Sequence, residues 1–582
     1  MTEQAIKDIF TNRKFGIFVH WGLYSMLGGV WKDKKTPYIA EWIMKRSRIP
    51  AKEYEQLAEK FNPSAFDPAG WIETVARAGA RYFVFTAKHH DGFAMYRSKC
   101  NRYNVIDASG FNIDPIEALA DQCRKRDIKF CLYYSQDQDW HHPHGTGNDW
   151  DFDPEKKDFS IYFEEKVKPQ VTELLSNYGP IGLIWFDTPV QISRRHSKEL
   201  FELVHRLQPD CLVNGRLGHG IGDYGQTEDN DIPAGGTGQA WEVPATMNDS
   251  WGYKTHDRNW KSPQLLLNQL IEVISKGGNY LLNIGPDGIG RIPTQSIQSA
   301  AYIGSWLKDN ARAVFGTKPS PFTGDFEWGY VTESGQRLYL IITDPDAGRI
   351  ELSGLRTHVK NMSLLSNQTA NISFNQQILP EKSIYMLSVD IPQWQTQRPL
   401  AVEVNCGEEI SADKTITQKH DGKISLEVLN SDIDSGGDFK PGTNSSIESW
   451  LKPKGSVKWS FRVLQPGRFE VSILTSMPRA DGDPASPVDW EGGHKIKISA
   501  AGQTLYTEIK KDFEETRTGS HAVYAGTRAG EIAFDSPGLY ELEIEPEHIN
   551  AKKGLGFTLR SVLLSSLIAN PRGSDKLIKA NA

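Results

Sequence analysis

The chain has 582 residues, which is far more than one domain of ordinary size, so two to four compact domains are expected. Its 73 acidic and 66 basic residues give a formal net charge of −7 and are mixed along the sequence, which argues against nucleic acid as a partner. No run of 18 apolar residues occurs, and residues 1–14 lack the features of a signal peptide, so neither a membrane span nor a leader is predicted. The expected compartment is the cytoplasm, or the periplasm or exterior if a leader was removed.

From Phe15 to Gly316, short apolar runs alternate with amphipathic patterns of helical period. This alternation is typical of β-α units built around a parallel sheet. The predicted strands are 15–20, 82–88, 129–135, 181–187, 211–215 and 280–284, and the predicted helices are 68–80, 115–127, 159–178, 197–207, 263–275 and 294–314. Six strands in this length fit a (β/α)8-like barrel with one or two more strands hidden in 217–260, and an open doubly wound sheet is the alternative.

After Gly316 the helical period ends, and a Pro- and Gly-rich linker leads into β-rich sequence. The runs that predict strands are 337–342, 383–389, 457–462, 468–474, 494–500 and 539–544. Gly, Pro and Asp turns separate them, as in β-sandwiches. We therefore predict an α/β chain with a barrel over 1–316, one β-sandwich over 317–395, a second over 396–569 and a flexible tail over 570–582.

Polar or aromatic side chains recur where the predicted barrel strands end. The groups are His20-Trp21-Gly22, Lys88-His89-His90-Asp91-Gly92, Tyr133-Tyr134-Ser135, Trp185-Phe186-Asp187 and Asn214-Gly215-Arg216. Barrel enzymes place their chemistry at the carboxyl ends of the strands, so this pattern predicts an active site at that end.

Asp187 closes the apolar run 181–187 and follows Trp185 by two residues. A lone strand-end Asp is often a turn former or a helix cap. Beside the other strand ends, however, it is a candidate nucleophile of a retaining glycosidase. Such an enzyme needs a second carboxyl group about 5–5.5 Å away, whereas an inverting enzyme spaces the pair about 6.5–9.5 Å apart.

At these positions the sequence resembles the α-L-fucosidases of glycoside hydrolase family 29. The resemblance covers about residues 10–316 and rests on seven motifs in matching order: KFGIFVHWG (14–22), AEW (40–42), KHHDGF (88–93), LYYS (132–135), WFD (185–187), SWGY (250–253) and NYLLNIGP (279–286). It implies a (β/α)8-like catalytic domain followed by a β-sandwich, no metal or other cofactor, and hydrolysis of terminal α-L-fucosyl linkages by double displacement.

Carried over by motif, the resemblance implies that Asp187 is the nucleophile. It also implies a fucose pocket formed by His20, Glu41, Trp42, His89, His90, Tyr134, Trp185, Arg216 and Trp251. A 6-deoxy sugar presents one methyl group and three hydroxyls, so an apolar wall facing hydrogen-bond partners suits it. The expected partner is a fucosylated oligosaccharide or glycoconjugate; the aglycone, the linkage and the oligomeric state, including a homo-oligomer, stay open.

The family places its general acid/base in a variable loop, which corresponds here to residues 222–233. Glu228 aligns best with the loop glutamate, Glu242 is the second candidate and Asp229 the third. A solvated acidic loop is the structural alternative for Glu228. The acid must carry a proton at working pH, which burial favours.

Three alternative functions remain at this stage. His89-His90 and the cluster of His141, His142 and His144 suggest a metal hydrolase, but adjacent strand residues point to opposite faces, so His89 and His90 would not share a metal readily. A fucose-binding protein without catalysis is the second, and side activity on α-galactosides is the third. The five widely spaced cysteines predict free thiols.

The last predicted domain contains Trp450, Trp459 and Trp490. It resembles, at low specificity, the carbohydrate-binding modules that are joined to such enzymes. A structural sandwich is the other interpretation, and the exposure of Trp490 separates the two.

Overall fold

The computed structural model describes residues 3–233, 235, 239–324, 326–367, 372–380, 384–394, 398–419, 421–436, 446–447, 449–477, 490–516 and 523–567. The chain divides into two compact units, one formed by Met1–Asn230 and Gly238–Thr317 and the other by Asp231–Thr237 and Lys318–Ala582. No helix in the described part of the chain is long and apolar enough to cross a membrane.

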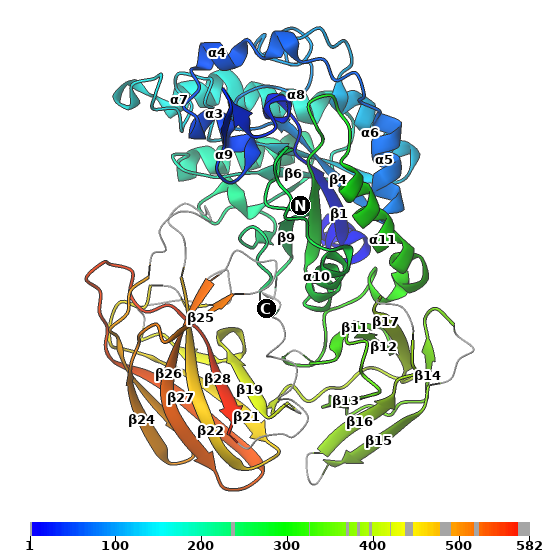
Figure 1. Cartoon of the computed structure of the whole chain (residues 1–582), viewed down its shortest axis with the longest axis vertical. Helices are drawn as coiled ribbons and strands as arrows, with labels where there is room; N and C mark the ends of the chain where they lie inside the picture. The colour runs from blue at the N-terminus through cyan, green and yellow to red at the C-terminus, as the bar shows by residue number, and fades with distance from the viewer. Residues whose placement is uncertain are drawn as a thin grey trace. The chain divides into compact units, whose positions relative to one another are not determined.

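The first unit is built around eight parallel strands. They are β1 (Phe15–Val19), β4 (Tyr82–Lys88), β5 (Lys129–Tyr134), β6 (Leu183–Phe186), β7 (Leu212–Val213), β8 (Gly225–Gln226), β9 (Trp241–Thr246) and β10 (Asn279–Ile284). Their order in the sheet is β7-β6-β5-β4-β1-β10-β9-β8, and Asn214 after β7 forms a parallel bridge to Tyr224 before β8. This bridge joins the two ends of the sheet, so the predicted (β/α)8-like barrel is confirmed (Figure 1).

One or two strands were expected within 217–260, and the structure has two there, β8 and β9. β8 has only two residues, and β9 contains Glu242, Pro244 and Thr246 among its six residues. The central strands have a clearer pattern, because β1 and β4 are buried along their whole length and consist mainly of apolar residues, as strands covered on both faces do.

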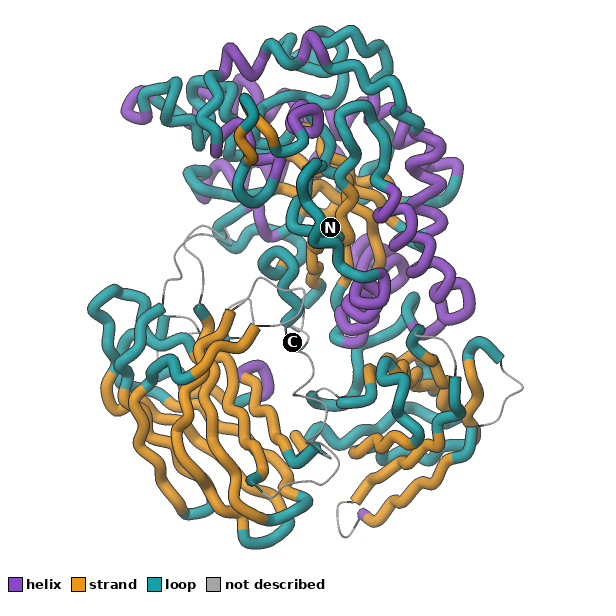
Figure 2. Tube along the Cα trace, in the orientation of Figure 1, coloured by secondary structure: helices purple, strands orange, loops and turns teal. Residues whose placement is uncertain are grey.

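Helices flank the barrel strands (Figure 2). They are α5 (Pro68–Arg77), α6 (Pro115–Lys125), α7 (Phe159–Tyr162) continuing into α8 (Lys168–Asn177), α9 (Arg194–Leu207), α10 (Pro263–Ser275) and α11 (Thr294–Asn310). Five begin at side-chain caps whose oxygens accept backbone N–H groups of the first turn, namely Asp67, Asp114, Asp158, Ser193 and Ser262. Between α7 and α8 the chain forms a π-helical turn (Phe163–Val167), just before Pro169, which cannot donate the usual backbone hydrogen bond.

Shorter elements complete the first unit. They are α1 (Glu3–Lys7), the π-turn η1 (Asp8–Arg13), α2 (Leu23–Leu27), β2 (Val30–Trp31), β3 (Lys34–Lys35), η2 (Ala40–Trp42), α3 (Ile43–Arg46), α4 (Ala51–Glu55), η3 (Ala58–Lys60), η4 (Pro154–Lys156), η6 (Gly215–Leu217) and η7 (Ala311–Ala313). Most of those after β1 lie in the connections that leave the carboxyl ends of the barrel strands, so they can carry site residues.

The first sandwich of the second unit packs two antiparallel sheets. One has the order β11-β12-β17-β14 and the other β13-β16-β15, and apolar residues of both sheets, such as Leu340 and Leu387, share one core. The strands are β11 (Gly329–Ser334), β12 (Arg337–Ile342), β13 (Arg349–Ser353), β14 (Asn361–Leu364), β15 (Phe374–Leu379), β16 (Ile384–Asp390) and β17 (Leu400–Asn405).

The second sandwich has a sheet of order β18-β21-β27-β23-β24, with β20 beside β21, and another of order β19-β28-β22-β26-β25. Its strands are β18 (Ile416–Thr417), β19 (Lys423–Glu427), β20 (Asp432–Asp434), β21 (Ser456–Val463), β22 (Gly467–Ser476), β23 (Lys495–Ala500), β24 (Gln503–Glu508), β25 (Phe513–Thr516), β26 (Val523–Phe534), β27 (Gly538–His548) and β28 (Leu559–Ser566). The two sheets enclose one apolar core.

The predicted boundary between the sandwiches at 395/396 is too early. β17 begins at Leu400 and pairs with β12 and β14 of the first sandwich, so the first sandwich extends to at least Asn405. The sequence signal was wrong because the Pro-containing stretch before β17 joins two strands of the same sandwich. The predicted tail over 570–582 lies outside the described residues.

The three tryptophans of the second sandwich serve its core. Trp450 and Trp459 are fully buried, and their indole N–H groups donate to Lys454 O and Glu427 O. Trp490 is partly buried against the same core and donates to Thr475 Oγ1 at 2.9 Å. These contacts favour the structural interpretation of the three rings. All five cysteines are free, and four of them are buried.

Candidate active site

The candidate site lies at the carboxyl end of the barrel because strand alternation points one set of side chains into it. Phe18, Tyr133 and Trp185 belong to one buried interior cluster. Asp187 follows Trp185 by two residues and therefore extends from the same face of β6 at the end of the strand. Only 9% of Asp187 is exposed.

The carboxylate of Asp187 has a donor on each oxygen. Arg216 Nη1 donates to Oδ1 at 3.1 Å, and the Tyr133 hydroxyl donates to Oδ2 at 2.9 Å. Burial by itself raises the pKa of this carboxyl group, but the Arg216 charge and the hydrogen bonds from Tyr133 and Arg216 outweigh burial and hold the pKa below its ordinary value. Asp187 is therefore ionised at neutral pH, as a nucleophile must be.

One guanidinium connects Asp187 to a second carboxylate. Arg216 lies in the η6 turn that follows β7, and its Nη2 donates to Asp229 Oδ1 at 2.5 Å while Nη1 holds Asp187. The guanidinium also lies 4.9 Å from the ring centre of Trp185. The charges of Asp229 and Asp187 outweigh the burial of Arg216 and raise its pKa. Arg216 thus brings the two carboxylates together at the barrel mouth.

His20 and His90 act as neutral acceptors at this mouth. Asn283 Nδ2 donates to Trp251 O, so its Oδ1 accepts from His20 Nδ1 at 2.7 Å; Ser135 donates to Gln138 O, so its hydroxyl oxygen accepts from His90 Nδ1 at 2.7 Å. Burial lowers the pKa of His20 to about 4 and that of His90 to about 3. The Nε2 atoms of both rings are therefore left as acceptors, and that of His90 lies 3.5 Å from Asp187 Oδ2.

Aromatic rings and a buried glutamate complete the pocket predicted by motif. Trp251 packs on His20 at 5.1 Å between ring centres, and Trp42 packs edge-on against His90 at 5.3 Å. Glu41 Oε2 accepts Gly252 N–H at 2.8 Å. Glu41 Oε1 and His89 Nδ1 are buried and have no hydrogen-bond partner among the described residues. Buried polar atoms are ordinarily hydrogen-bonded, so both are suited to the hydroxyls of a ligand.

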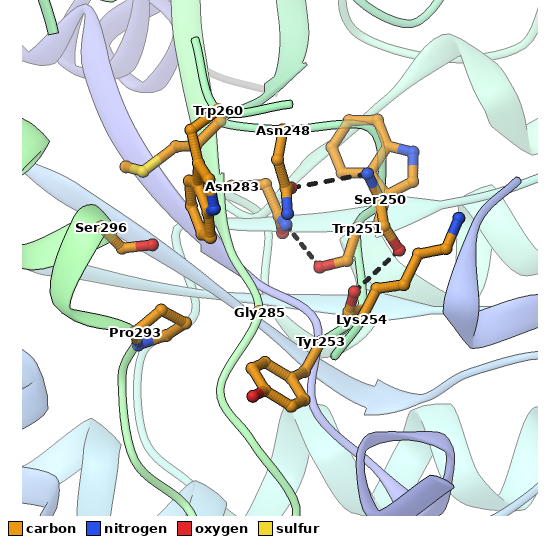
Figure 3. A pocket seen from close by; sticks show the side chains of 12 residues that line it. Asn248, Ser250, Trp251, Tyr253, Lys254, Trp260, Asn283, Gly285, Pro293 and Ser296 are labelled. Carbon is orange, nitrogen blue, oxygen red and sulfur yellow. Dashed lines mark hydrogen bonds between the residues drawn. The ribbon is translucent and has the colours of Figure 1, made fainter. Parts of the chain in front are cut away.

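The loop around Trp251 is fixed by a hydrogen bond from β10. Figure 3 shows Asn283 Nδ2 donating to Trp251 O at 2.7 Å and Ser250 Oγ donating to Gly252 O at 2.7 Å. A small pocket lies against this loop, lined by residues that include Trp251, Tyr253, Trp260, Asn283 and Pro293. The loop position of Trp251 therefore depends on Asn283, a residue that the motif-derived pocket did not include.

The tyrosine of the predicted pocket needs a correction by one position. The prediction named Tyr134, but its hydroxyl donates to Gln170 Oε1 of α8 at 2.8 Å, on the helix side of β5. Its neighbour Tyr133 points into the barrel and contacts Asp187. Successive side chains of a strand point to opposite faces, so only one of these two tyrosines can face the site.

The two tyrosines form a matched pair for a test. We expect Tyr133→Phe to lower kcat about 10-fold to 100-fold, because Asp187 loses a hydrogen bond from an uncharged donor to a charged acceptor. Tyr134→Phe removes an equally buried hydroxyl and should leave kcat within about twofold. Steady-state kinetics with both variants checks this, and equal losses in the two would contradict the assignment.

The predicted acid/base candidates differ in place. Glu228 is exposed. Glu242 is the second residue of β9 and lies within the barrel, where Tyr82 of β4 and Trp185 donate to its two oxygens at 2.7 and 2.9 Å. Burial raises the pKa of Glu242 to about 7, as a general acid needs. Its position argues against an acid/base role. Its partner Tyr82 is the first residue of β4, and Glu242 itself lies four residues before the carboxyl end of β9, so it is deep in the barrel and away from the mouth.

Gln136 is a further site residue that the motifs did not identify. Its Oε1 accepts Asp187 N–H at 2.8 Å, and its Nε2 donates to Arg216 O at 3.0 Å. It directly follows the LYYS motif, so its place after the end of β5 was the available signal. The described residues contain no group of three or more His, Cys, Asp or Glu side chains placed to hold a metal ion.

Comparisons with known proteins agree with this geometry. The model of the family described as Alpha-L-fucosidase matches residues 1–312. The crystal structure of an α-L-fucosidase from Vibrio sp. strain EJY3 is 32% identical, with a TM-score of 0.82 over 98% of this chain and 99% of that chain. An α-L-fucosidase from Lactobacillus casei, in complex with α-L-fucose product, is 40% identical, with a TM-score of 0.51 over 53% of this chain and 100% of that chain. Plasma α-L-fucosidase of Homo sapiens is 31% identical over 329 residues, which are 53% of this chain and 69% of that protein.

Proposed function

The chain belongs to the α-L-fucosidase family, and from this premise we propose that Asp187 is the nucleophile with which it hydrolyses terminal α-L-fucosyl linkages. The observation that carries the proposal is the pair of carboxylates on Arg216, Asp187 at 3.1 Å and Asp229 at 2.5 Å. A retaining glycosidase needs two carboxyl groups about 5–5.5 Å apart. Two carboxylates that share the adjacent nitrogens of one guanidinium lie within reach of that separation.

The pocket residues suit a 6-deoxy sugar. The rings of Trp42, Trp185 and Trp251 supply apolar surface for the methyl group and the C–H face of fucose. Around them, the Nε2 atoms of His20 and His90 offer acceptors, and the buried Oε1 of Glu41 offers another. Hydroxyl selectivity is strong where buried polar groups would otherwise stay unpaired. We therefore assign these residues to fucose binding.

The mechanism follows as two displacements. In the first, an Asp187 oxygen forms a bond to the anomeric carbon while the bond to the leaving oxygen breaks and that oxygen takes a proton from the general acid. In the second, the residue that acted as the general acid now acts as the base and removes a proton from water. The water oxygen bonds to the anomeric carbon, and Asp187 leaves as a carboxylate. Each displacement inverts the anomeric carbon, so the two together restore its original configuration.

We assign the acid/base role to Asp229 in preference to Glu228. Asp229 and Asp187 both accept a hydrogen bond from Arg216, whereas the Glu228 side chain is exposed to solvent. Residues 228 and 229 follow β8, and Arg216 lies in the η6 turn after the neighbouring strand β7. The acid/base residue and Arg216 thus come from adjacent strand ends. The aglycone that leaves past this loop belongs to a fucosylated glycan.

Azide distinguishes the two candidates. In an acid/base variant of a retaining enzyme, azide can attack the fucosyl-enzyme without base assistance and yields the α-L-fucosyl azide. We expect Asp229→Ala to lower kcat on 4-nitrophenyl α-L-fucoside by roughly 10² to 10³-fold and to recover activity with azide, with α-L-fucosyl azide identified by proton NMR. Glu228→Ala is the matched control and should keep kcat within about threefold. If azide restored activity to Glu228→Ala but not to Asp229→Ala, the acid/base role would belong to Glu228 instead.

A further inference from the structure

Glu242 is a buried carboxyl group that the proposed mechanism does not use. It is fully buried. Its Oε2 accepts a hydrogen bond from the Tyr82 hydroxyl at 2.7 Å, and its Oε1 accepts one from Trp185 Nε1 at 2.9 Å. In the register of the barrel, Glu242 pairs with Asn279, the first residue of β10. It therefore lies near the amino ends of the strands, beneath Trp185.

Trp185 contacts both side chains that hold the nucleophile. The Arg216 guanidinium lies 4.9 Å from its ring centre, and the Tyr133 ring packs nearly parallel to it at 5.8 Å. Arg216 donates to one oxygen of Asp187 and Tyr133 to the other. A single indole ring thus contacts the side chains that hold both oxygens of the Asp187 carboxylate.

The indole ring has one polar atom, and Glu242 binds it. Burying a carboxyl group is costly unless its oxygens are hydrogen-bonded, so an apolar residue at this position would be the cheaper way to fill the barrel. A carboxylate instead fixes Nε1 of Trp185 directionally, because the N–H donor must point at Oε1. Tyr82 fixes the other oxygen, so the carboxyl plane is also held.

We propose that Glu242 is a positioning residue, which sets the Trp185 indole and through it the alignment of Arg216 and Tyr133 on Asp187. The inference rests on the proposed function, since it concerns the same nucleophile. It replaces an acid/base role for Glu242 by one that is exerted through Trp185. Misplacement of reacting groups by about 1 Å can cost on the order of 100-fold in rate.

Substitutions at position 242 test this directly with 4-nitrophenyl α-L-fucoside. Glu242→Leu removes both acceptors and should lower kcat about 10-fold to 100-fold, with KM within about threefold. Glu242→Gln keeps an acceptor for Trp185, while its amide can donate to the Tyr82 hydroxyl, so kcat should stay within about threefold of wild type. Azide should not restore Glu242→Leu, which separates positioning from acid/base catalysis.

A double-mutant cycle shows whether the effect passes through Trp185. Trp185→Phe removes the indole N–H, so Glu242→Leu in that background should cause little further loss of kcat. Glu272→Leu on α10 is the control, because Glu272 is also a buried carboxyl, paired with Lys276 at 2.7 Å. It should lower the melting temperature without lowering kcat.

Three results would overturn the inference: an unchanged kcat in Glu242→Leu, losses that multiply fully in the double variant, or azide rescue. If Glu242→Leu does not fold, Tyr82→Phe replaces it, with an expected kcat loss of about threefold to tenfold that disappears in Trp185→Phe; an additive loss would contradict the inference. A wild-type protein without hydrolytic activity would contradict the proposed function itself, and the inference with it.

Discussion

Asp187→Asn is expected to lower kcat on 4-nitrophenyl α-L-fucoside by roughly 10⁴-fold or more, as loss of a covalent nucleophile does in other enzymes. Asparagine is close in shape, so the Arg216 contact to the remaining oxygen can persist and the fold should be kept. The wild type should release α-L-fucose first, before mutarotation, when the reaction is followed by proton NMR.

Azide adds a second readout for this variant. Without the nucleophile, azide can attack the anomeric carbon directly, and the product expected is β-L-fucosyl azide. Asp114→Asn is the control, since Asp114 is a similarly buried carboxylate that caps α6, and Asn caps helices as well as Asp does. A wild type that releases β-L-fucose first, or an Asp187→Asn enzyme with near-normal kcat, would exclude the mechanism.

Arg216→Met is expected to have the next largest effect, a loss of about 10³-fold in kcat/KM. It removes the donor to Asp187 Oδ1 and the contact to Asp229 together, and it leaves the charge of the buried Asp187 carboxylate uncompensated. Because Arg216 lowers the pKa of Asp187 whereas burial raises it, its loss must raise that pKa. The ionised form of Asp187 is the active one, so the acid limb of the kcat/KM profile should move to higher pH.

The pH profile separates this electrostatic effect from a general loss of stability. Arg13→Met is the matched control, because Arg13 is also largely buried and pairs with Asp8 at 3.1 Å, just before β1 and so at the amino ends of the strands. That variant should lose stability but keep the wild-type acid limb. An acid limb that stays in place in Arg216→Met would contradict the role given to Arg216.

The barrel could be predicted where strands are long and buried on both faces. β4 coincides with its predicted run, and β1, β5 and β10 differ from theirs by one residue at an end. β8 could not be predicted, because two residues show no period, and Pro244 makes β9 look unlike a strand. The sandwich boundary failed for a different reason: pairing of β17 with β12 is a long-range contact that local turn residues do not reveal.

The candidate site shows the same division between local and long-range information. Asp187 and Arg216 follow strand ends, and their contact confirms that these ends meet. Tyr133 and Tyr134 are adjacent and chemically identical, so only the phase of β5 decides between them. Asp229 and Glu228 are adjacent acidic residues, and only the structure shows which of them contacts Arg216. For Glu242, a raised pKa and its place in the sequence shortly after the acid/base loop pointed toward catalysis, and only its depth in the barrel argues otherwise.

The closure between β7 and β8 has a consequence for how such an enzyme can diversify. Two-residue strands and one bridge hold this seam, so a longer or shorter connection there sacrifices few backbone hydrogen bonds. The residues assigned to the sugar ring lie mostly on the arc from β10 through β1 to β6, whereas Asp229 lies just after the seam. Insertions or deletions near the β7–β8 closure can therefore change the preference for the leaving group, while the residues that bind fucose stay the same.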